Sequence, residues 1–500
     1  GHSVNPMRAL PLMLGWLLIA LLALADPANK PSPDKAAQGS DSNPDTLYAS
    51  RKKLQVRSTS GVFTNWRWAM VWLTQILYYG LPWLTWNDRQ AVLFHLTERK
   101  FYIFGWVFWP QDVFYLAILL IISAYALFFF TAIAGRLWCG YTCPQTVYTE
   151  IFMWIEEKIE GDHNKRRKLD AAPMDARKFM LRGAKFGAWA IFSLWTGFTL
   201  VAYFSPVEEL LQALTTFGFG PWETFWILFY AGFTYVFAGL LREQVCKYMC
   251  PYARFQGVMF DPDTLVVTYD EFRGEPRGTR KKGVDPKTVG KGDCIDCGIC
   301  VQVCPTGIDI RQGLQYECIG CGACIDACDQ VMDKMSYPRG LIRYSTENAL
   351  KKRWGMKEIL VHVARPRTLI YGGLLVAICI AMVVGLATRT DLRVDILRDR
   401  ATLAREVEGG LIENVYRLQV INMIEEARNV TISVSGLDGI HLDSDGLAAL
   451  PAATTESVTV QVRVPYDAAE PGVHQIVFEV VVDDDPSVVV REGTTFIIPR

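Results

Sequence analysis

The chain has 500 residues, of which 51% are hydrophobic and 21% are charged, and it contains 15 tryptophans. This mixture is typical of a membrane protein with soluble parts, and the length excludes a single hydrophobic core. The formal net charge of −1 gives no indication of a nucleic-acid-binding surface.

Thirteen cysteines are present, and their distribution argues against a disulfide framework. Twelve of them fall into four spaced groups, and none lies beyond Cys379. Such grouping in a long chain favours ligation of metals or iron–sulfur clusters over disulfide bonds.

Residues 1–66 are predicted to form an apolar segment followed by a flexible, basic cytoplasmic linker. Residues 10–25 resemble a cleavable signal peptide, with Arg8 before an apolar run. Cleavage there would export the basic stretch at 51–67, so an extra membrane helix, or translated sequence upstream of the true start, is an equally good interpretation. Residues 26–46 have the composition of a linker.

Five apolar stretches are long enough to cross the hydrocarbon layer of a membrane. They lie at 69–86, 113–134, 186–204, 222–241 and 369–387. The first four belong to a predicted transmembrane region at 67–245, and the fifth helix is expected at 366–388.

The basic residues predict the orientation of these spans. The segments before the first span, between the second and third, and before the fifth are rich in Lys and Arg, whereas 205–221 contains neither. By the positive-inside rule, the segment before the first span and residues 246–365 lie in the cytoplasm, and the residues after the fifth span lie outside. We expect the membrane to be a bacterial inner membrane, for which the outer side is the periplasm.

Two CxxxCP motifs occur at the inner ends of the second and fourth predicted spans. Cysteines four apart share a face of a helix, and the proline after each pair is expected to stop that helix. Packing of small apolar side chains is the usual explanation of a lone motif, but the repetition in equivalent positions favours function. The four cysteines are Cys139, Cys143, Cys246 and Cys250.

A site made of these thiols favours Cu(I) over Cu(II), because soft sulfur ligands match the softer ion. Copper in such a site would accept an electron from a nearby iron–sulfur cluster. Arg136, Arg242 and Lys247 lie close in sequence and are candidates for lowering the pKa values of the thiols. Met153 and Met249 could add thioether ligands, although packing is the commoner role of methionine.

Residues 246–365 are predicted to form a cytoplasmic ferredoxin-like domain with two [4Fe-4S] clusters. The pattern Cx2Cx2Cx3CP is followed 24 residues later by Cx2Cx2Cx3C, and in this pattern the fourth cysteine of each motif ligates the other cluster. The first cluster is therefore assigned to Cys294, Cys297, Cys300 and Cys328, and the second to Cys318, Cys321, Cys324 and Cys304. A zinc site would need only four ligands, so it is the weaker interpretation.

Residues 389–500 show alternation of apolar and polar residues with period two, for example at 458–464 and 476–482. Turn residues separate these runs, which predicts an antiparallel β-sandwich. The segment contains no cysteine, so an immunoglobulin-like fold is an architectural expectation.

The segments 109–112, 135–145, 242–261 and 314–350 resemble the cytochrome c oxidase accessory proteins of the CcoG family, also called FixG or RdxA. The resemblance covers about 45–387 and includes both CxxxCP motifs and both ferredoxin motifs in the family's order. It implies a cupric reductase that supplies Cu(I) for assembly of a cbb-type cytochrome c oxidase, with that oxidase and its copper-assembly factors as partners. The CxxxCP cysteines correspond to the family's membrane-edge cysteines, and an outer immunoglobulin-like domain is also implied.

Three functions remain open from the sequence. The first is reduction of Cu(II) to Cu(I) at the CxxxCP site with electrons from an unidentified cytoplasmic donor. The second is a module that oxidises membrane quinol and feeds electrons to a partner enzyme. The third is a non-catalytic assembly factor for the oxidase, in which the clusters sense redox state.

Overall fold

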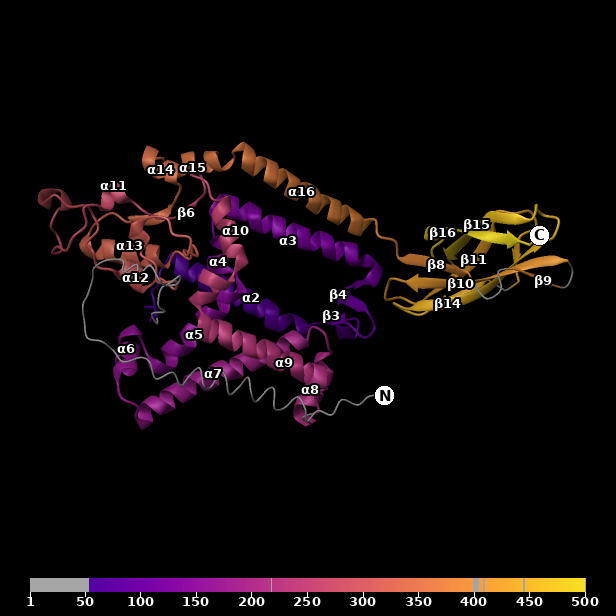
Figure 1. Ribbon diagram of the computed structural model, residues 1–500, viewed down its shortest axis with the longest axis horizontal. Coiled ribbons are helices and arrows are strands. Elements are labelled where there is room, and N and C mark those ends of the chain that lie inside the picture. Colours follow the sequence, from indigo (N-terminus) through magenta and orange to yellow (C-terminus); the bar gives the residue numbers. More distant parts are fainter. Residues whose placement is uncertain (1–53, 217, 399–403, 408–409, 444–445, 500) are drawn as a thin grey trace, which may run out of the picture. The chain divides into compact units, whose positions relative to one another are not determined.

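A computed structural model describes residues 54–216, 218–398, 404–407, 410–443 and 446–499. The predictions for residues 10–25 and 26–46 lie outside this part. The chain forms two units. The first contains the described residues up to Gly80, Tyr125–Ala202 and Glu208–Gly372, and the second contains Leu81–Ala124, Tyr203–Val207 and the described residues from Gly373 onward (Figure 1).

Within the part of the chain that the structure describes, three helices are long and apolar enough to cross a membrane. Most of their apolar side chains are exposed, as expected for helices that face lipid. They correspond to the second, fourth and fifth predicted spans. They are α3 (Val113–Ala134) with the preceding 3-10 turn η3 (Pro110–Asp112), α9 (Pro221–Thr234) with its π-helical continuation η4 (Tyr235–Leu241), and α16 (Pro366–Ala387).

The other two predicted spans fall on helices that carry charge. Helix α2 (Val62–Gly80) ends at Gly80, so the prediction that it continues to residue 86 is wrong: Leu81–Trp83 forms the 3-10 turn η2. Helix α7 (Ala176–Val201) carries four basic residues before residue 186. The count of five spans stays a prediction. The expected loop at 205–221 contains helix α8 (Val207–Thr216).

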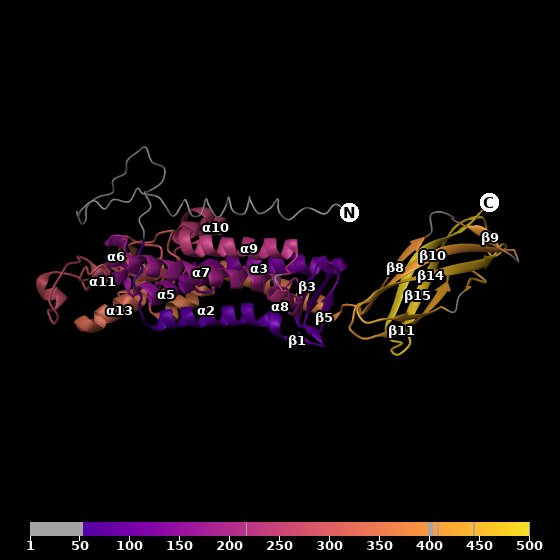
Figure 2. The ribbon, with the colours of Figure 1, turned by 90° about the horizontal axis from the view of Figure 1, so that it is seen from below.

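In the first unit, α7 packs against both α5 (Pro144–Glu160) and α9 (Figures 1 and 2). The side chains of Phe152, Trp189 and Ala238 form the buried core of this packing, with the Phe152 and Trp189 rings 5.2 Å apart. Asp162 caps the short helix α6 (His163–Ala171) by accepting a hydrogen bond from the backbone of Lys165 at 3.0 Å.

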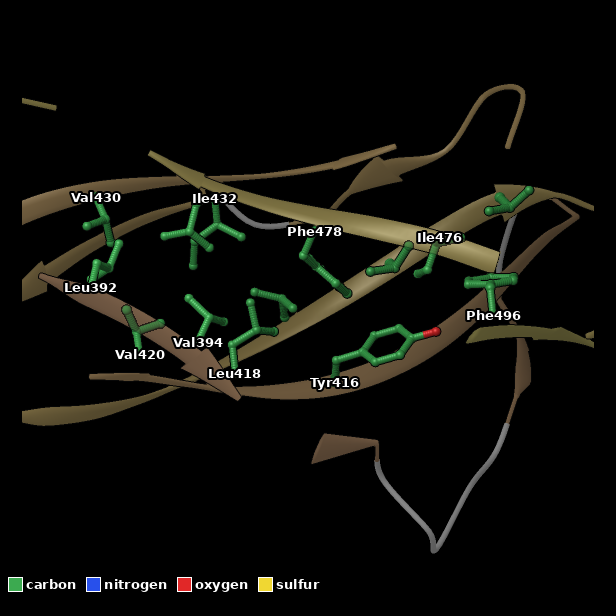
Figure 3. Close-up of a cluster of buried hydrophobic side chains, with 14 of the residues drawn as sticks. Leu392, Val394, Tyr416, Leu418, Val420, Val430, Ile432, Ile476, Phe478 and Phe496 are labelled. Atoms are coloured by element: carbon green, nitrogen blue, oxygen red, sulfur yellow. The ribbon is translucent and has the colours of Figure 1, made fainter. Parts of the chain in front are cut away.

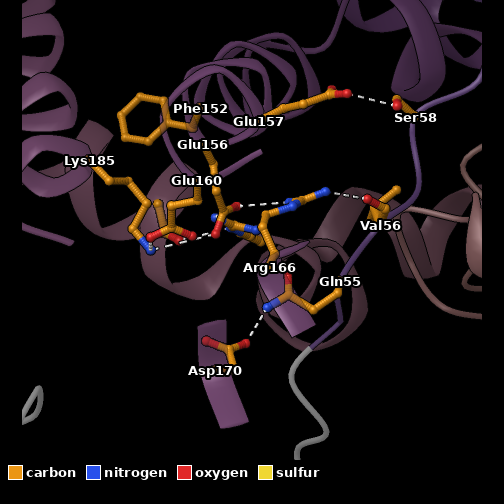
Figure 4. A network of polar contacts seen from close by, with 12 residues as sticks. Gln55, Val56, Ser58, Phe152, Glu156, Glu157, Glu160, Arg166, Asp170 and Lys185 are labelled. Carbon is orange, nitrogen blue, oxygen red and sulfur yellow. Dashed lines mark hydrogen bonds and ion pairs between the residues drawn. The ribbon is translucent and has the colours of Figure 1, made fainter. Parts of the chain in front are cut away.

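A buried carboxylate on α5 joins this helix to α6, to α7 and to the residue that follows η4. Glu156 on α5 is 1% exposed and pairs with Arg242 (2.8 Å), Arg166 (3.4 Å) and Lys185 (3.5 Å). Lys185 also pairs with Glu160 at 3.0 Å (Figure 4). Burial opposes ionisation of Glu156, but Arg242, Lys185 and Arg166 together lower its pKa to about 2.

The ferredoxin part of the first unit is built on one antiparallel pair, β6 (Val266–Tyr269) and β7 (Ile342–Ser345), in which Val266 faces Ser345. Its core contains Met332 and Leu341, each 1% exposed. Short helices complete this part: α11 (Glu271–Gly274), η6 (Pro286–Val289), α12 (Ile299–Gln302), η7 (Ile310–Gln312), α13 (Ala323–Met335), α14 (Glu347–Lys352) and α15 (Met356–Val363).

The C-terminal residues of the second unit form two antiparallel sheets, which confirms the predicted sandwich. Inward-facing residues alternate as expected, and Tyr416 and Phe478 meet in the core with ring centroids 5.2 Å apart (Figure 3). One sheet has the order β12 (His441–Leu442), β14 (Thr455–Pro465), β10 (Leu411–Asn422), β8 (Leu392–Arg398), with β9 (Arg405–Val407) also on β10. The other has the order β13 (Leu447–Leu450), β11 (Arg428–Ser435), β15 (Gly472–Val482), β16 (Val489–Ile498).

Two small sheets that the sequence analysis did not predict belong to the second unit. Along the chain they follow α2 and precede α3. They are the hairpin β1 (Thr85–Trp86)–β2 (Arg89–Gln90) and the meander β3 (Val92–His95), β4 (Lys100–Ile103), β5 (Trp106–Phe108).

We predict that Glu156→Gln destabilises the protein by about 3–5 kcal/mol at pH 7, because three partly buried cations lose their common counter-charge. Because the folded pKa is depressed, the stabilisation is present above the unfolded pKa of 4.5 and is lost as the pH falls toward about 2. Thermal unfolding in detergent between pH 3 and pH 7 measures both effects. The adjacent Glu157→Gln, which loses only an exposed bond to Ser58, is the control, and equal melting temperatures of the two variants would contradict the prediction.

Candidate functional site

The first ferredoxin motif is held by α12 and the turn before it. Cys294 and Cys300 are buried and Cys297 is exposed. Gly298 precedes α12 with φ +66°, a backbone conformation that side chains disfavour. Cys328 comes from α13, and burial together with the charges of Cys300, Cys294 and Cys297 raises the pKa of its thiol to about 12. The fourth cysteine of the second motif therefore lies beside the three cysteines of the first.

The second motif surrounds a small, mainly apolar cavity. Cys318, Cys321, Cys324 and Cys304 line it, together with Ile308 and Ile310 and one cysteine of the first motif, Cys300. Burial raises the pKa of Cys318 to about 12, with the charges of Cys321 and Cys304 adding to the rise. The backbone N–H of Gly320 donates to the Cys318 sulfur at 3.4 Å. Cys304, from the first motif, is thus placed with the second.

The donor set suits two iron–sulfur cubanes. Eight soft thiols lie in two groups of four, and in each group a cluster would supply the positive charge that a buried thiol such as Cys318 or Cys328 lacks. Across the described residues, no three His, Cys, Asp or Glu side chains gather closely enough to hold a single metal ion. The assignment of each ligand stays a prediction, and the placement of Cys304 and Cys328 agrees with it.

Each CxxxCP motif lies at a break between two helices. Cys139 is on α4 (Leu137–Tyr141), and Cys143 is the N-cap of α5. Cys246 is on the π-helix η5 (Val245–Met249), and Cys250 is the N-cap of α10 (Pro251–Met259). A helix ends before each proline as expected, at Tyr141 and at Met249, and each proline also begins the next helix, because the first helical position needs no N–H donor. The prediction that the two cysteines of each pair share one helix face is wrong, since the second cysteine lies beyond the end of the first helix.

The four CxxxCP thiols lie near one another. Burial, with the charges of Cys143 and Cys250, raises the pKa of Cys139 to about 11. Burial, with the charges of Cys143, Cys139 and Cys250, raises the pKa of Cys246 to about 12. The four thiols are thus within electrostatic reach of one another, although no three of them gather closely enough in the described chain to hold a metal ion as they stand.

Of the basic residues expected to lower these pKa values, Arg136 does oppose the rise at Cys139 and Cys246, but burial outweighs it. Arg242 is used differently, since it pairs with Glu156 in the network described above. Of the two methionines, Met249 is 52% exposed on η5 and Met153 lies on α5.

The first CxxxCP motif touches the loop of the second ferredoxin motif. A Cβ added at Gly140 would lie 2.8 Å from the Ile319 oxygen and 3.0 Å from Cys321 Cα. Cys139 packs against a buried group that includes Ile319 and Cys321. Only a residue without a side chain permits this approach between the two backbones.

Gln256, which the sequence analysis did not identify, supports this contact together with Arg136. Gln256 is fully buried and accepts hydrogen bonds from Arg136 Nε at 2.9 Å and from Cys139 Sγ at 3.4 Å. Arg136 also donates to the carbonyl of Tyr316, two residues before Cys318.

Helix α2 begins on the second ferredoxin motif. Asp326, between Cys324 and Cys328, accepts hydrogen bonds from the backbone of Phe63 at 3.2 Å and of Thr64 at 2.7 Å. A carboxylate at this position satisfies the free N–H groups and complements the helix dipole. Burial raises the pKa of Cys321, and the positive charge of Arg67 on α2 partly opposes that rise, so Arg67 also lies near this motif.

Taken together, two interleaved cysteine motifs and three apolar helices define a membrane-associated iron–sulfur protein of the ferredoxin type. Comparison with known families agrees: a 4Fe-4S dicluster domain matches residues 241–347, and a 4Fe-4S binding domain matches residues 116–161. An IG-like fold found at the C-terminus of FixG matches residues 382–499.

Similar proteins include the nitrogen fixation protein FixG of Rhizobium meliloti, which is 38% identical over 78% of this chain and 80% of its own length. Protein RdxB of Cereibacter sphaeroides is 39% identical over 85% of this chain and 90% of its own. A crystal structure of a FixG-related protein from Vibrio parahaemolyticus covers 22% of this chain and 97% of its own, with 18% identity and a TM-score of 0.20. The chain belongs to the FixG family, and it is an iron–sulfur redox protein.

We predict that Gly140→Ala destabilises the protein by about 1–3 kcal/mol, because the new methyl group meets backbone atoms of the second ferredoxin loop. The visible absorption of the clusters should also be lost at a lower temperature than in the unaltered protein. Gly187→Ala on α7 is the control, since nothing lies within 4 Å of its added Cβ. If Gly140→Ala melted at or above the temperature of this control, the close contact would be disproved.

Proposed function

We propose that the protein is a cupric reductase that uses iron–sulfur electrons to reduce Cu(II) to Cu(I) at the CxxxCP thiols. The observation that carries this proposal is the contact of Cys139 and Gly140 with the loop that bears Cys321. An electron leaving the second cluster position would reach the membrane-edge thiols without crossing solvent.

The four CxxxCP thiols provide the copper site in this proposal. Burial favours the neutral forms of Cys139, Cys143 and Cys246, so binding of a copper ion releases protons and supplies the charge that the site lacks. Thiolates bind Cu(I) better than Cu(II), which makes the one-electron reduction of bound copper favourable. Arg136, which is 5% exposed, limits the repulsion among the thiolates.

The arrangement in the membrane is part of the proposal. Five spans across a bacterial inner membrane would place the ferredoxin domain at 246–365 in the cytoplasm and the sandwich at 389–500 in the periplasm. The Cu(I) product would serve assembly of a cbb-type cytochrome c oxidase, and that oxidase and its copper-assembly factors would be the partners.

The test uses anaerobic protein whose clusters have been reduced and freed of excess reductant. Cu(II) and a Cu(I)-selective chelator are then added, and the chelate is followed by absorbance. We expect Cys143→Ser and Cys250→Ser to slow formation of the chelate at least about tenfold, because each removes a copper ligand but no ferredoxin cysteine.

Cys379→Ser, on α16, is the matched control and should keep the full rate. Iron content is measured for each variant, so that loss of clusters is not mistaken for loss of the copper site. Unchanged rates in both CxxxCP variants, with full iron content, would disprove the proposed copper site.

A further inference from the structure

A large cavity lies within the first unit, on the side of α2 that faces α5 and α7. Its volume is about 670 Å³, within the range of pockets that bind small organic ligands. Residues of α2, α5, α7 and the two ferredoxin motifs line it. None of its lining residues belongs to the CxxxCP motifs or to the cysteines assigned to the clusters.

The part of the cavity along the helices is aromatic. Trp68, Trp72, Trp154, Phe192 and Trp195 contribute to its wall. The rings of Trp68 and Trp154 meet edge to face with centroids 6.5 Å apart. Such a wall suits a flat, apolar ring, which can stack on tryptophan faces or meet their edges.

The cavity also contains polar groups suited to a ligand with hydroxyl groups. Gln75 and Thr59 line it, and within the described residues Gln75 Oε1 and Thr59 Oγ1 are buried without hydrogen-bond partners. Arg67 and Glu150, also in the wall, form a partly buried ion pair. A buried oxygen without a donor is costly, so a ligand that donates hydrogen bonds would stabilise this arrangement.

The far side of the cavity reaches the second cluster position. Val303 and Pro305 flank Cys304, Ala323 precedes Cys324, and all three line the cavity. The end of the cavity at the start of α2 therefore lies one residue away, along the chain, from two of the four cysteines assigned to the second cluster. Gln75 lies further along α2, about 16 Å from Thr64 at 1.5 Å per helical residue, so a ring bound at Gln75 would pass its electrons along the cavity to that end.

We propose that this cavity binds a membrane quinol and that the protein oxidises the quinol there. An aromatic wall, free hydrogen-bond acceptors, helices that include apolar membrane-type surface and adjacency to cluster cysteines all fit the ring of a lipid-soluble hydroquinone. Quinol bound in this cavity would be the source of electrons for the proposed function. The inference rests on that function only for the statement that the electrons go on to copper.

The reaction balances with groups that the chain provides. Oxidation of one quinol breaks two O–H bonds and yields one quinone, two protons and two electrons. The eight ferredoxin cysteines would hold two [4Fe-4S] clusters, and such clusters would accept one electron each, which accounts for both electrons. Glu157, which lines the cavity and accepts a hydrogen bond from exposed Ser58 at 2.9 Å, can pass protons to water. One quinol would thus support reduction of two copper ions.

The experiment measures binding and electron entry separately, without copper. Full-length protein with oxidised clusters is titrated anaerobically with a decyl-substituted benzoquinone, and the Kd is taken from quenching of tryptophan fluorescence. The matching benzoquinol is then added, and bleaching of the cluster absorption is followed. We expect Gln75→Leu to raise the Kd about tenfold, because one hydrogen bond is lost, and to slow bleaching at low quinol concentration.

Trp72→Leu tests the aromatic wall and should also weaken binding, whereas Trp222→Leu is the control because Trp222 on α9 is similarly exposed (74% against 61% for Trp72) but does not line the cavity. Copper reduction by pre-reduced clusters should be unchanged in all three variants, which separates this inference from the proposed function. An unchanged Kd in both cavity variants would overturn the inference. Displacement of the quinone by decanol alone would also overturn it, since that would indicate a site for acyl chains.

Discussion

The close approach of two backbones at Gly140 is the constraint on which this structure depends. One backbone belongs to the CxxxCP helix α4, and the other to the ferredoxin loop at Ile319–Cys321. A Cβ atom added at Gly140 would lie only 2.8 Å from the Ile319 oxygen, which is too close for any side chain. A soluble iron–sulfur fold and a set of membrane-edge thiols are thereby held in contact. Without that contact the two groups of cysteines would be separate sites with separate functions.

Two further sets of interactions keep the contact in place. Asp326 fixes the start of α2 on the second ferredoxin motif. Glu156 collects Arg166, Lys185 and Arg242, and Arg242 lies four residues before Cys246, so the network also fixes the approach to the second CxxxCP motif. A π-helix on each side of Arg242 accompanies this arrangement, and such helices are frequent near functional sites.

Much of this arrangement could be predicted from the sequence because the signals are local. Cysteine spacing indicated the two interleaved groups, and period-two alternation indicated the sandwich. The end of α2 at Gly80 was missed because Leu81, Trp83 and Trp86 are as apolar as the helix before them. Gln256, Asp326 and the unpartnered Gln75 oxygen could not be found, since their roles depend on neighbours more than a hundred residues away or on a cavity.

The central claim is that two iron–sulfur clusters lie beside a separate group of four thiols. The most direct measurement is iron and sulfide analysis of anaerobically purified protein, together with paramagnetic resonance of its reduced form. The account predicts about eight irons per chain and two interacting spin systems, as for two four-iron clusters in one ferredoxin fold. About twelve irons would show that the CxxxCP thiols hold a cluster instead of copper, and colourless, iron-free protein would contradict the account as a whole.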